Sequence, residues 1–362
     1  MPKAVAVAVV AALLALAGCS APAPAPTSAP LPSQAPLAEL DLAPDPRAVE
    51  GPTSAVLAAA DVHVIDPPAA QSLPATVVSH DAGGQREVVV DDTSRVIAID
   101  LAGSIAATVA GLGLADLLVG RDMTTTFPGS EDLPVVTSGA HTVSAESVLA
   151  LRPTLVLTDG TIGPRDVLEQ LREAGVTVVF LHSEPSFDGA AQLARDVGAA
   201  LGAVEGGERL AEAITDEVAA KVAEIQAIAP VAEADRVRML FLYLRGGAGV
   251  YYLFGEESGA DELIRGLGGV DVAGDIGWDG MKPMTDEALV AANPDLVFVM
   301  TEGLASAGGV DGLLASKPAL ALTAAGQHRR FVDMDDGSVL GFGPRTAAVL
   351  DALARAVYAP DA

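Results

Sequence analysis

Tyr243 and Arg245 stand two positions apart at the end of the apolar run Met239–Leu244. Such a run is typical of a buried strand, and residues at positions i and i+2 of a strand project to the same side. A phenol ordinarily keeps its proton up to a pH of about 10, but a neighbouring guanidinium favours the phenolate without losing its own proton. The pair therefore predicts an anionic oxygen donor. The alternative is an ordinary strand aromatic, which is the interpretation we prefer for Tyr251 and Tyr252.

One of the five histidines is a further candidate ligand: His141, in the loop Gly139-Ala-His-Thr142. Without context, a histidine in such a loop is more often an ordinary surface residue. The other histidines (His63, His80, His182 and His328) are scattered and form no short metal-binding motif, which disfavours a site for free zinc or manganese. The sequence also lacks a Gly-x-Ser-x-Gly elbow and a phosphate-binding glycine loop, so a hydrolase or a nucleotide enzyme has little support.

A repeated segment indicates the frame that holds these residues. Ser144–Leu157 returns as Thr285–Phe298, so that Glu146 matches Glu287 at a constant offset of 141 residues. In each copy the Ser or Thr suits a helix N-cap, the glutamate falls in the first turn, and a proline ends the helix before an apolar strand. We expect two similar lobes around a cleft, where small ligands bind.

Strands alternate with helices on both sides of one long helix. This order is typical of parallel sheets, and Gly111-Leu-Gly113 and Gly266-Leu-Gly268 are expected to end equivalent helices. We predict an α/β fold with two Rossmann-like lobes of mostly parallel sheet, joined by one long helix. The predicted divisions are a signal peptide (1–18), an Ala/Pro-rich tether (19–50), an uncertain lead-in segment (51–92), an N-terminal lobe (93–201), the linking helix (202–228) and a C-terminal lobe (229–362).

The N-terminus is typical of an export signal. Lys3 precedes a short apolar run that ends at Leu16-Ala-Gly-Cys19, and Cys19 is the only cysteine of the chain. This ending resembles a bacterial lipobox, in which the cysteine carries a lipid anchor. We therefore expect attachment to the outer face of the cytoplasmic membrane. A formal charge of −27 makes nucleic acid an unlikely partner.

Taken together, the lipobox, the doubled Pro-(Thr/Asp)-Leu-Val motif and the linking helix resemble the substrate-binding lipoproteins of ABC importers (class III), which carry cobalamin, siderophores or haem. Within that class the chain is most similar to haem-importer binding proteins of the HmuT type. That resemblance implies His141 and Tyr243 as opposite axial ligands of the haem iron, with Arg245 tuning the tyrosine. It further implies that Glu146 and Glu287 contact arginines of the permease.

The function implied is capture of haem b as transported cargo, without catalysis. The expected partners are the permease with its ATPase and upstream haem-receptor proteins, and the expected state is a monomer. Open alternatives are the same fold binding a ferric siderophore or cobalamin, and a haem-dependent enzyme or sensor. Further candidates for the haem pocket are Met300, Trp278, Lys282, which stands 141 residues after His141, and Arg345.

Overall fold

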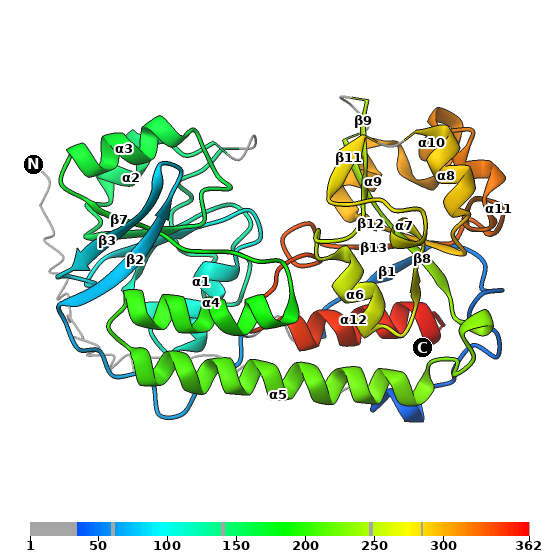
Figure 1. Ribbon diagram of the computed structural model, residues 1–362, viewed down its shortest axis with the longest axis horizontal. Coiled ribbons are helices and arrows are strands. Elements are labelled where there is room, and N and C mark those ends of the chain that lie inside the picture. The colour runs from blue at the N-terminus through cyan, green and yellow to red at the C-terminus, as the bar shows by residue number, and fades with distance from the viewer. Residues whose placement is uncertain (1–34, 59–61, 139–141, 246–248, 284, 362) are drawn as a thin grey trace, which may run out of the picture. The chain divides into compact units, whose positions relative to one another are not determined.

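Two separate sheets form the framework of the molecule (Figure 1). The computed structural model describes residues 35–58, 62–138, 142–245, 249–283 and 285–361. Residues 34–362 group into one compact unit. The α/β fold expected from the sequence is confirmed, with one sheet above each end of the long helix α5 (Val204–Ile228) in the view of Figure 1.

The first sheet has the order β5-β4-β6-β7, and all of its strand pairs are parallel. Every residue of β4 and β6 is buried, as expected for parallel strands that are covered on both faces. The strands are β4 (Val96–Ile99), β5 (Leu118–Arg121), β6 (Leu155–Thr158) and β7 (Thr177–Phe180), and the helices are α1 (Ser104–Gly111), α2 (Ala145–Ala150), α3 (Arg165–Glu173) and α4 (Phe187–Ala200).

The second sheet has the order β1-β13-β12-β8-β9-β11, and β10 also pairs with β8. Its centre is parallel, whereas β9 and β11 are antiparallel additions at one edge. The strands are β1 (Thr53–Ala55), β8 (Arg238–Arg245), β9 (Val250–Phe254), β10 (Val270–Asp271), β11 (Met281–Pro283), β12 (Leu296–Met300) and β13 (Phe331–Met334). The helices are α6 (Ala260–Gly266), α7 (Val272–Asp275), α8 (Asp286–Ala292), α9 (Thr301–Ser306), α10 (Gly309–Ser316), α11 (Ala324–His328) and α12 (Thr346–Tyr358).

The duplication seen in the sequence is present in the structure. Ser144 caps α2 by accepting a hydrogen bond from Ser147 N, and Thr285 caps α8 through Ala288 N, both at 3.2 Å. The helices α1 and α6 both end in a left-handed glycine, Gly113 (φ 74°) and Gly268 (φ 70°). Glycine adopts this conformation without the steric cost that a Cβ atom brings, which explains the repeated Gly-Leu-Gly.

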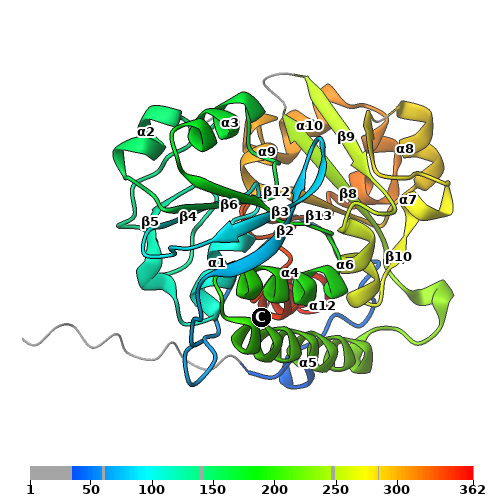
Figure 2. The ribbon, with the colours of Figure 1, turned by 60° about the vertical axis from the view of Figure 1, so that its left-hand side comes forward.

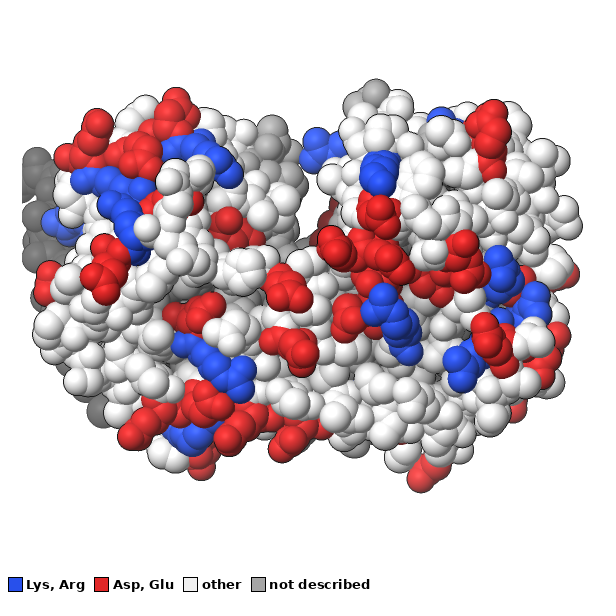
Figure 3. All heavy atoms as spheres, viewed as in Figure 1, with Lys and Arg blue, Asp and Glu red and all other residues white. Residues whose placement is uncertain are grey.

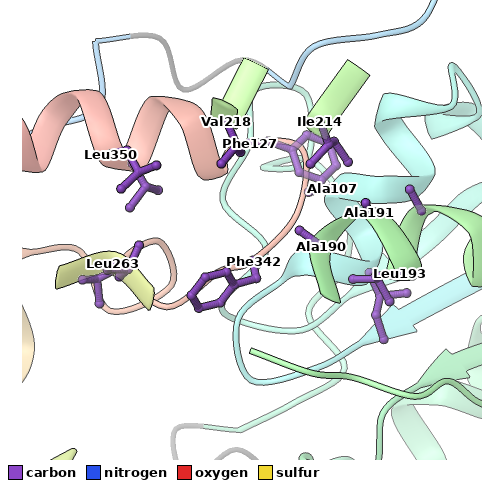
Figure 4. Close-up of a cluster of buried hydrophobic side chains, with 14 of the residues drawn as sticks. Ala107, Phe127, Ala190, Ala191, Leu193, Ile214, Val218, Leu263, Phe342 and Leu350 are labelled. Atoms are coloured by element: carbon purple, nitrogen blue, oxygen red, sulfur yellow. The ribbon is translucent and has the colours of Figure 1, made fainter. Parts of the chain in front are cut away.

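The long helix α5 packs along α4 and then along α12. At its first half Gly207 meets Gly198 of α4 so closely that a Cβ on Gly198 would lie 2.6 Å from the Gly207 Cα. Farther along, Ile214 and Val218 join a buried cluster with Phe342 (Figure 4). Because the cluster also includes Ala190 and Leu263, one hydrophobic core continues from the first lobe into the second.

The N-terminal segment packs differently from the expected tether. Leu37 is fully buried and donates its backbone N–H to Glu224 of α5 at 2.9 Å, although 19–50 was predicted to be a flexible linker. Arg47 binds the Asp295 carboxylate at 2.8 Å, and β1 then joins the second sheet beside β13. Residues 35–55 are therefore part of the fold on the side of the second lobe.

The later part of the lead-in segment, from Ile65 on, packs against the first lobe. Ile65 N donates to Gly111 O at 2.9 Å, and Arg209 of α5 donates to the carbonyls of Asp66 and Pro67. A hairpin follows, formed by β2 (Ala75–Asp81) and β3 (Gly84–Val90), and β2 lies against α4 and β7 (Figure 2). Thus the segment between residues 51 and 92 supplies a strand to one lobe and a hairpin to the other.

Candidate functional site

Tyr243 lies near the carboxyl end of β8, half-buried, with Leu244 buried on the opposite side of the strand. Its ring stacks on Phe254 (centroids 6.0 Å apart, interplanar angle 17°) and contacts Tyr252 at a tilt. Two positions on, Arg245 is exposed, and among the described residues no hydrogen bond joins the two side chains. The strand pairing thus fixes the phenol ring, while the guanidinium stays accessible to a ligand.

A cavity of about 690 Å³ opens beside Tyr243 and Arg245. This volume is within the range of sites for small molecules and cofactors. The cavity has one wall from each lobe: loops that follow β4 and β5 on one side, and the ends of β8, β12 and β13 on the other. Its lining residues are Leu101, Met123, Thr124, Thr126, Tyr243, Leu244, Arg245, Met300, Glu302, Gly303, Ser306, Asp335, Asp336 and Gly337. All these strands present their carboxyl ends, where open α/β sheets bind ligands.

The charges in the cavity are unevenly placed. Arg245 is the only cation among the described lining residues, whereas Glu302, Asp335 and Asp336 are acidic. Asp336 accepts the backbone N–H of Glu302 at 2.9 Å, which ties the loop after β13 to the start of α9. An anionic group of a ligand is therefore attracted by Arg245 and repelled by these three carboxylates.

Two buried aspartates support the first-lobe wall. Asp122 is fully buried and accepts hydrogen bonds from the backbone N–H groups of Asp100, Thr124 and Thr125 at 2.7–3.0 Å. Asp100 in turn accepts the N–H groups of Ser104 and Ile105 at the start of α1. These bonds fix the loops that carry Leu101 and Met123, two exposed apolar residues of the cavity wall.

The buried side chain of Asp100 should make stability depend on pH. Burial, followed by the charges of Asp122 and Asp159, raises the pKa of Asp100 well above its ordinary value. The folded protein then holds a proton that the unfolded chain has lost, so the free energy of unfolding decreases as pH rises from about 4 toward the raised pKa. We expect Asp100→Asn to flatten this decrease in urea unfolding measured between pH 4 and 8. Asp116→Asn, in an exposed position, is the control, and an unchanged slope in Asp100→Asn would contradict the assignment.

A loop between β13 and α12 forms the floor between the two walls. A Cβ on Gly337 would lie 2.8 Å from Thr124 O, so the second-lobe loop touches the first-lobe wall directly. Behind the loop, Arg345 is 6% exposed at the start of α12, where burial lowers its pKa against the opposing influence of Asp335 and Asp100. Arg345 thus lies behind the cavity and is not among its lining residues.

Of the remaining candidates for the haem pocket, the structure places one in the cavity wall and two away from it. Met300 lines the cavity at the end of β12. Trp278 is half-buried against the second-lobe core, and its indole N–H donates to Leu253 O at 3.2 Å. Lys282 is exposed on β11, with its Nζ 3.8 Å from the Asp279 carboxylate. Neither Trp278 nor Lys282 is among the lining residues of the cavity.

His141 and Cys19 lie outside the described residues. Backbone hydrogen bonds hold the residues on either side of the His141 segment. Ser138 N donates to Thr142 O at 3.0 Å, and Val143 N donates to Gly163 O at 2.7 Å. Thr137, next to Ser138, accepts the backbone N–H of Met123 at 3.0 Å. The loop therefore begins and ends next to the wall that Met123 contributes to the cavity.

Glu146 and Glu287 are both exposed, each in the first turn of its capped helix. On the face shown in Figure 3, lysine and arginine groups lie among acidic side chains and form no extended basic patch. The described part of the chain contains no helix that is long and apolar enough to cross a membrane.

A family model described as periplasmic binding protein matches residues 99–337. The chain belongs to the periplasmic binding protein family. The solved structures similar to this family member include the heme-binding protein HmuT, with 40% identity, a TM-score of 0.79, and coverage of 87% of this chain and 99% of that one. Periplasmic heme-binding protein RhuT from Roseiflexus sp. RS-1 is 38% identical, with a TM-score of 0.65 and coverage of 74% and 99%.

A curated relative agrees with this placement. An uncharacterized ABC transporter substrate-binding lipoprotein, YvrC of Bacillus subtilis (strain 168), is 27% identical over 288 residues, which cover 79% of this chain and 86% of the relative. Further solved forms of HmuT carry alanine in place of a histidine, a tyrosine or an arginine, and its tyrosine and arginine are two residues apart. The resemblance stated from the sequence to this class of binding proteins is confirmed.

Sequence reasoning missed the first-lobe wall, namely Leu101, Met123, Thr124 and Thr126. The signal was available in part, because Asp100 and Asp122 each follow a strand of the parallel sheet. What the sequence did not reveal is that β5 ends beside β4, because β5 is only four residues long and follows a short 3₁₀ turn.

Proposed function

We propose that this protein binds haem in the cavity between its two lobes and delivers it to an ABC permease. The observation that carries the proposal is Tyr243 with Arg245 at the carboxyl end of β8, in the wall of a cavity of suitable volume. The same tyrosine and arginine spacing occurs in HmuT, a heme-binding protein. Haem is cargo here, and the chain's task is to hold and release it.

In this proposal Tyr243 and His141 bind opposite faces of the haem iron. Ferric iron accepts phenolate oxygen and imidazole nitrogen, and Arg245 favours the phenolate by its fixed positive charge. Support for His141 comes from the base of its loop, which Thr137 ties to Met123 in the cavity wall. Met300 and Met123 offer soft apolar surface against which a porphyrin plane can pack.

The cavity charges orient the porphyrin. Its two propionates are anionic, so they would avoid Glu302, Asp335 and Asp336 and lie toward Arg245. Lys282 and Arg345 are not part of the proposed haem site. Lys282 is exposed on β11, and Arg345 is buried behind the loop that forms the cavity floor. Trp278 is likewise assigned to the second-lobe core.

Two axial protein ligands distinguish a carrier from a haem enzyme. Chemistry at iron needs an open or exchangeable axial position, which the pair Tyr243 and His141 would close. A carrier of a siderophore or cobalamin would use the same cavity without iron bonds to these residues.

The experiment that tests the proposal is a haemin titration of the chain from Gln34 onward, followed by absorption spectroscopy. A saturable Soret shift at one haemin per chain is expected. Absence of saturation would overturn haem as the ligand, and binding of cobalamin or a ferric siderophore in its place would support the alternatives. Peroxidase turnover by the complex would favour an enzyme.

Delivery is proposed to depend on Glu146 and Glu287, exposed at equivalent places of the repeated segment. Acidic side chains at two matching positions suit a partner that presents basic groups twice, as a symmetric permease dimer does. The double variant Glu146→Ala/Glu287→Ala is expected to bind haemin like the wild type but to lower haem uptake by cells at least tenfold. Glu212→Ala on α5 serves as the control. Normal uptake by the double variant would refute the docking role.

The location follows from the proposed lipid anchor at Cys19, which would hold the protein at the outer face of the cytoplasmic membrane. Labelling of the full chain with a radioactive or alkynyl fatty acid in a bacterial host tests this, since Cys19→Ser should abolish the label.

A further inference from the structure

Two histidines from distant parts of the chain meet on the outside of the first lobe. His80 belongs to β2, and His182 follows the end of β7; their ring centroids are 5.5 Å apart with an interplanar angle of 34°. The spacing in the sequence gave no sign of this pair, because the β2–β3 hairpin brings the two segments together. Both rings are at least partly accessible to solvent.

The backbone on both sides of the pair is fixed. Phe180 N donates a hydrogen bond of 2.9 Å to the Oγ of Ser79, which is fully buried. Ser79 directly precedes His80, and Phe180 stands two positions before His182. Leu181 N then donates to Thr158 O at 2.7 Å. The backbone next to the two imidazoles is therefore fixed by a hydrogen-bonded junction of β2 and β7.

The separation suits a shared metal ion. Imidazole nitrogen binds Zn²⁺ or a similar ion at about 2.0–2.1 Å, which places two rings on one tetrahedral ion with centroids roughly 5–6 Å apart. We propose that His80 and His182 form a two-imidazole site for a divalent late transition metal, with Cu²⁺ bound more tightly than Zn²⁺. The site is independent of the cavity and of the proposed haem function.

Gln85 lies beside the ring nitrogen of His80 that would not bind the metal. It faces His80 across the hairpin, and its amide nitrogen lies 3.4 Å from His80 Nδ1. Oxygen and nitrogen of an amide exchange places by a simple flip. With its oxygen toward Nδ1, Gln85 accepts the Nδ1 proton and leaves Nε2 of His80 for the metal, the arrangement typical of metal-binding histidines.

The remaining coordination positions belong to water. Among the described residues no group of three or more His, Cys, Asp or Glu side chains surrounds a possible metal position. The neighbouring Asp81 is already held by Arg86 and Arg172, each at 2.6 Å. The site is thus open and exchangeable, unlike a structural zinc site with four protein ligands. The overall charge of −27 favours approach of a cation.

Titration of the chain from Gln34 onward with Cu²⁺ and, separately, Zn²⁺ tests the proposal by calorimetry and, for Cu²⁺, by electron paramagnetic resonance. We expect one tight Cu²⁺ per chain with nitrogen ligation that includes two imidazoles. His80→Ala and His182→Ala should each weaken binding about 100-fold or more, as loss of a ligand exceeds the 10- to 100-fold effect of an outer contact. Gln85→Ala should weaken it less.

His63→Ala is the matched control, because His63 is also exposed but lies beside Glu217, away from the pair. Circular dichroism and the haemin titration confirm that each variant is folded. Wild-type protein without saturable metal binding would overturn the proposal. So would retention of wild-type affinity in either His80→Ala or His182→Ala, since a shared ion requires both rings.

Discussion

Tyr243→Phe is expected to lower the affinity for haemin by about 100-fold or more, because removal of a direct iron ligand should exceed the 10- to 100-fold effects of outer contacts. Phenylalanine keeps the ring that stacks on Phe254 and contacts Tyr252, so packing of β8 against β9 is preserved. The change therefore isolates the phenolic oxygen. Haemin titration followed at the Soret band measures the affinity, and loss of the charge-transfer bands of a ferric phenolate identifies the ligand.

Tyr252→Phe is the matched control, because Tyr252 faces Tyr243 across the strand pair and is absent from the cavity lining. Arg245→Ala should give an intermediate loss of about tenfold, as expected for a group that tunes a ligand. An unchanged spectrum and affinity in Tyr243→Phe would show that the phenol is not a ligand, even if haem binds. The haem assignment itself is tested separately by saturation of the wild type.

Arg330→Ala is expected to lower the free energy of unfolding by about 3 kcal/mol, since it leaves buried acceptors unpaired and a cavity behind. Arg330 is 1% exposed and donates to Thr53 Oγ1 at 2.8 Å and to Ala356 O at 2.5 Å. It thereby joins the N-terminal segment, the second sheet and α12. Burial also lowers the pKa of Arg330 to about 10. Urea unfolding at pH 7 measures the loss.

The control for Arg330 is Arg195→Ala, which removes a surface ion pair with Glu208 and should cost less than about 1 kcal/mol. If Arg330→Ala is no more damaging than Arg195→Ala, the attachment of the N-terminal segment does not depend on this guanidinium.

Local signals predicted much of the framework. The duplicated caps at Ser144 and Thr285 and the repeated Gly-Leu-Gly ends belong to single turns, whose geometry depends on adjacent residues. The apolar strand expected after the proline of the second repeat and the linking helix expected at 202–228 also lie where strong periodicity is undisturbed, and the structure has them as β12 and α5 (Val204–Ile228).

Other parts depend on distant partners and were missed for that reason. The Ala/Pro-rich composition around Leu37 indicates a linker, yet the segment is held by burial of Leu37 beside α5 and α12 and by the contacts of Arg47 and β1. The pairing of β1 with β13 joins residues about 280 positions apart, and no local pattern encodes it. For the site, strand ends could be located from the sequence, but not which ends become neighbours across the cavity.

The path of the N-terminal segment has a mechanical consequence. Residues 35–55 are bonded to the second lobe, and from Ile65 onward the chain is bonded to the first. At both ends this segment contacts α5, through Glu224 and through Arg209. The lobes therefore share two covalent crossings, one through α5 and one through the chain between Ala55 and Ile65. A single connecting helix would allow the lobes to bend and twist against each other, whereas a second covalent crossing adds a constraint on their relative motion.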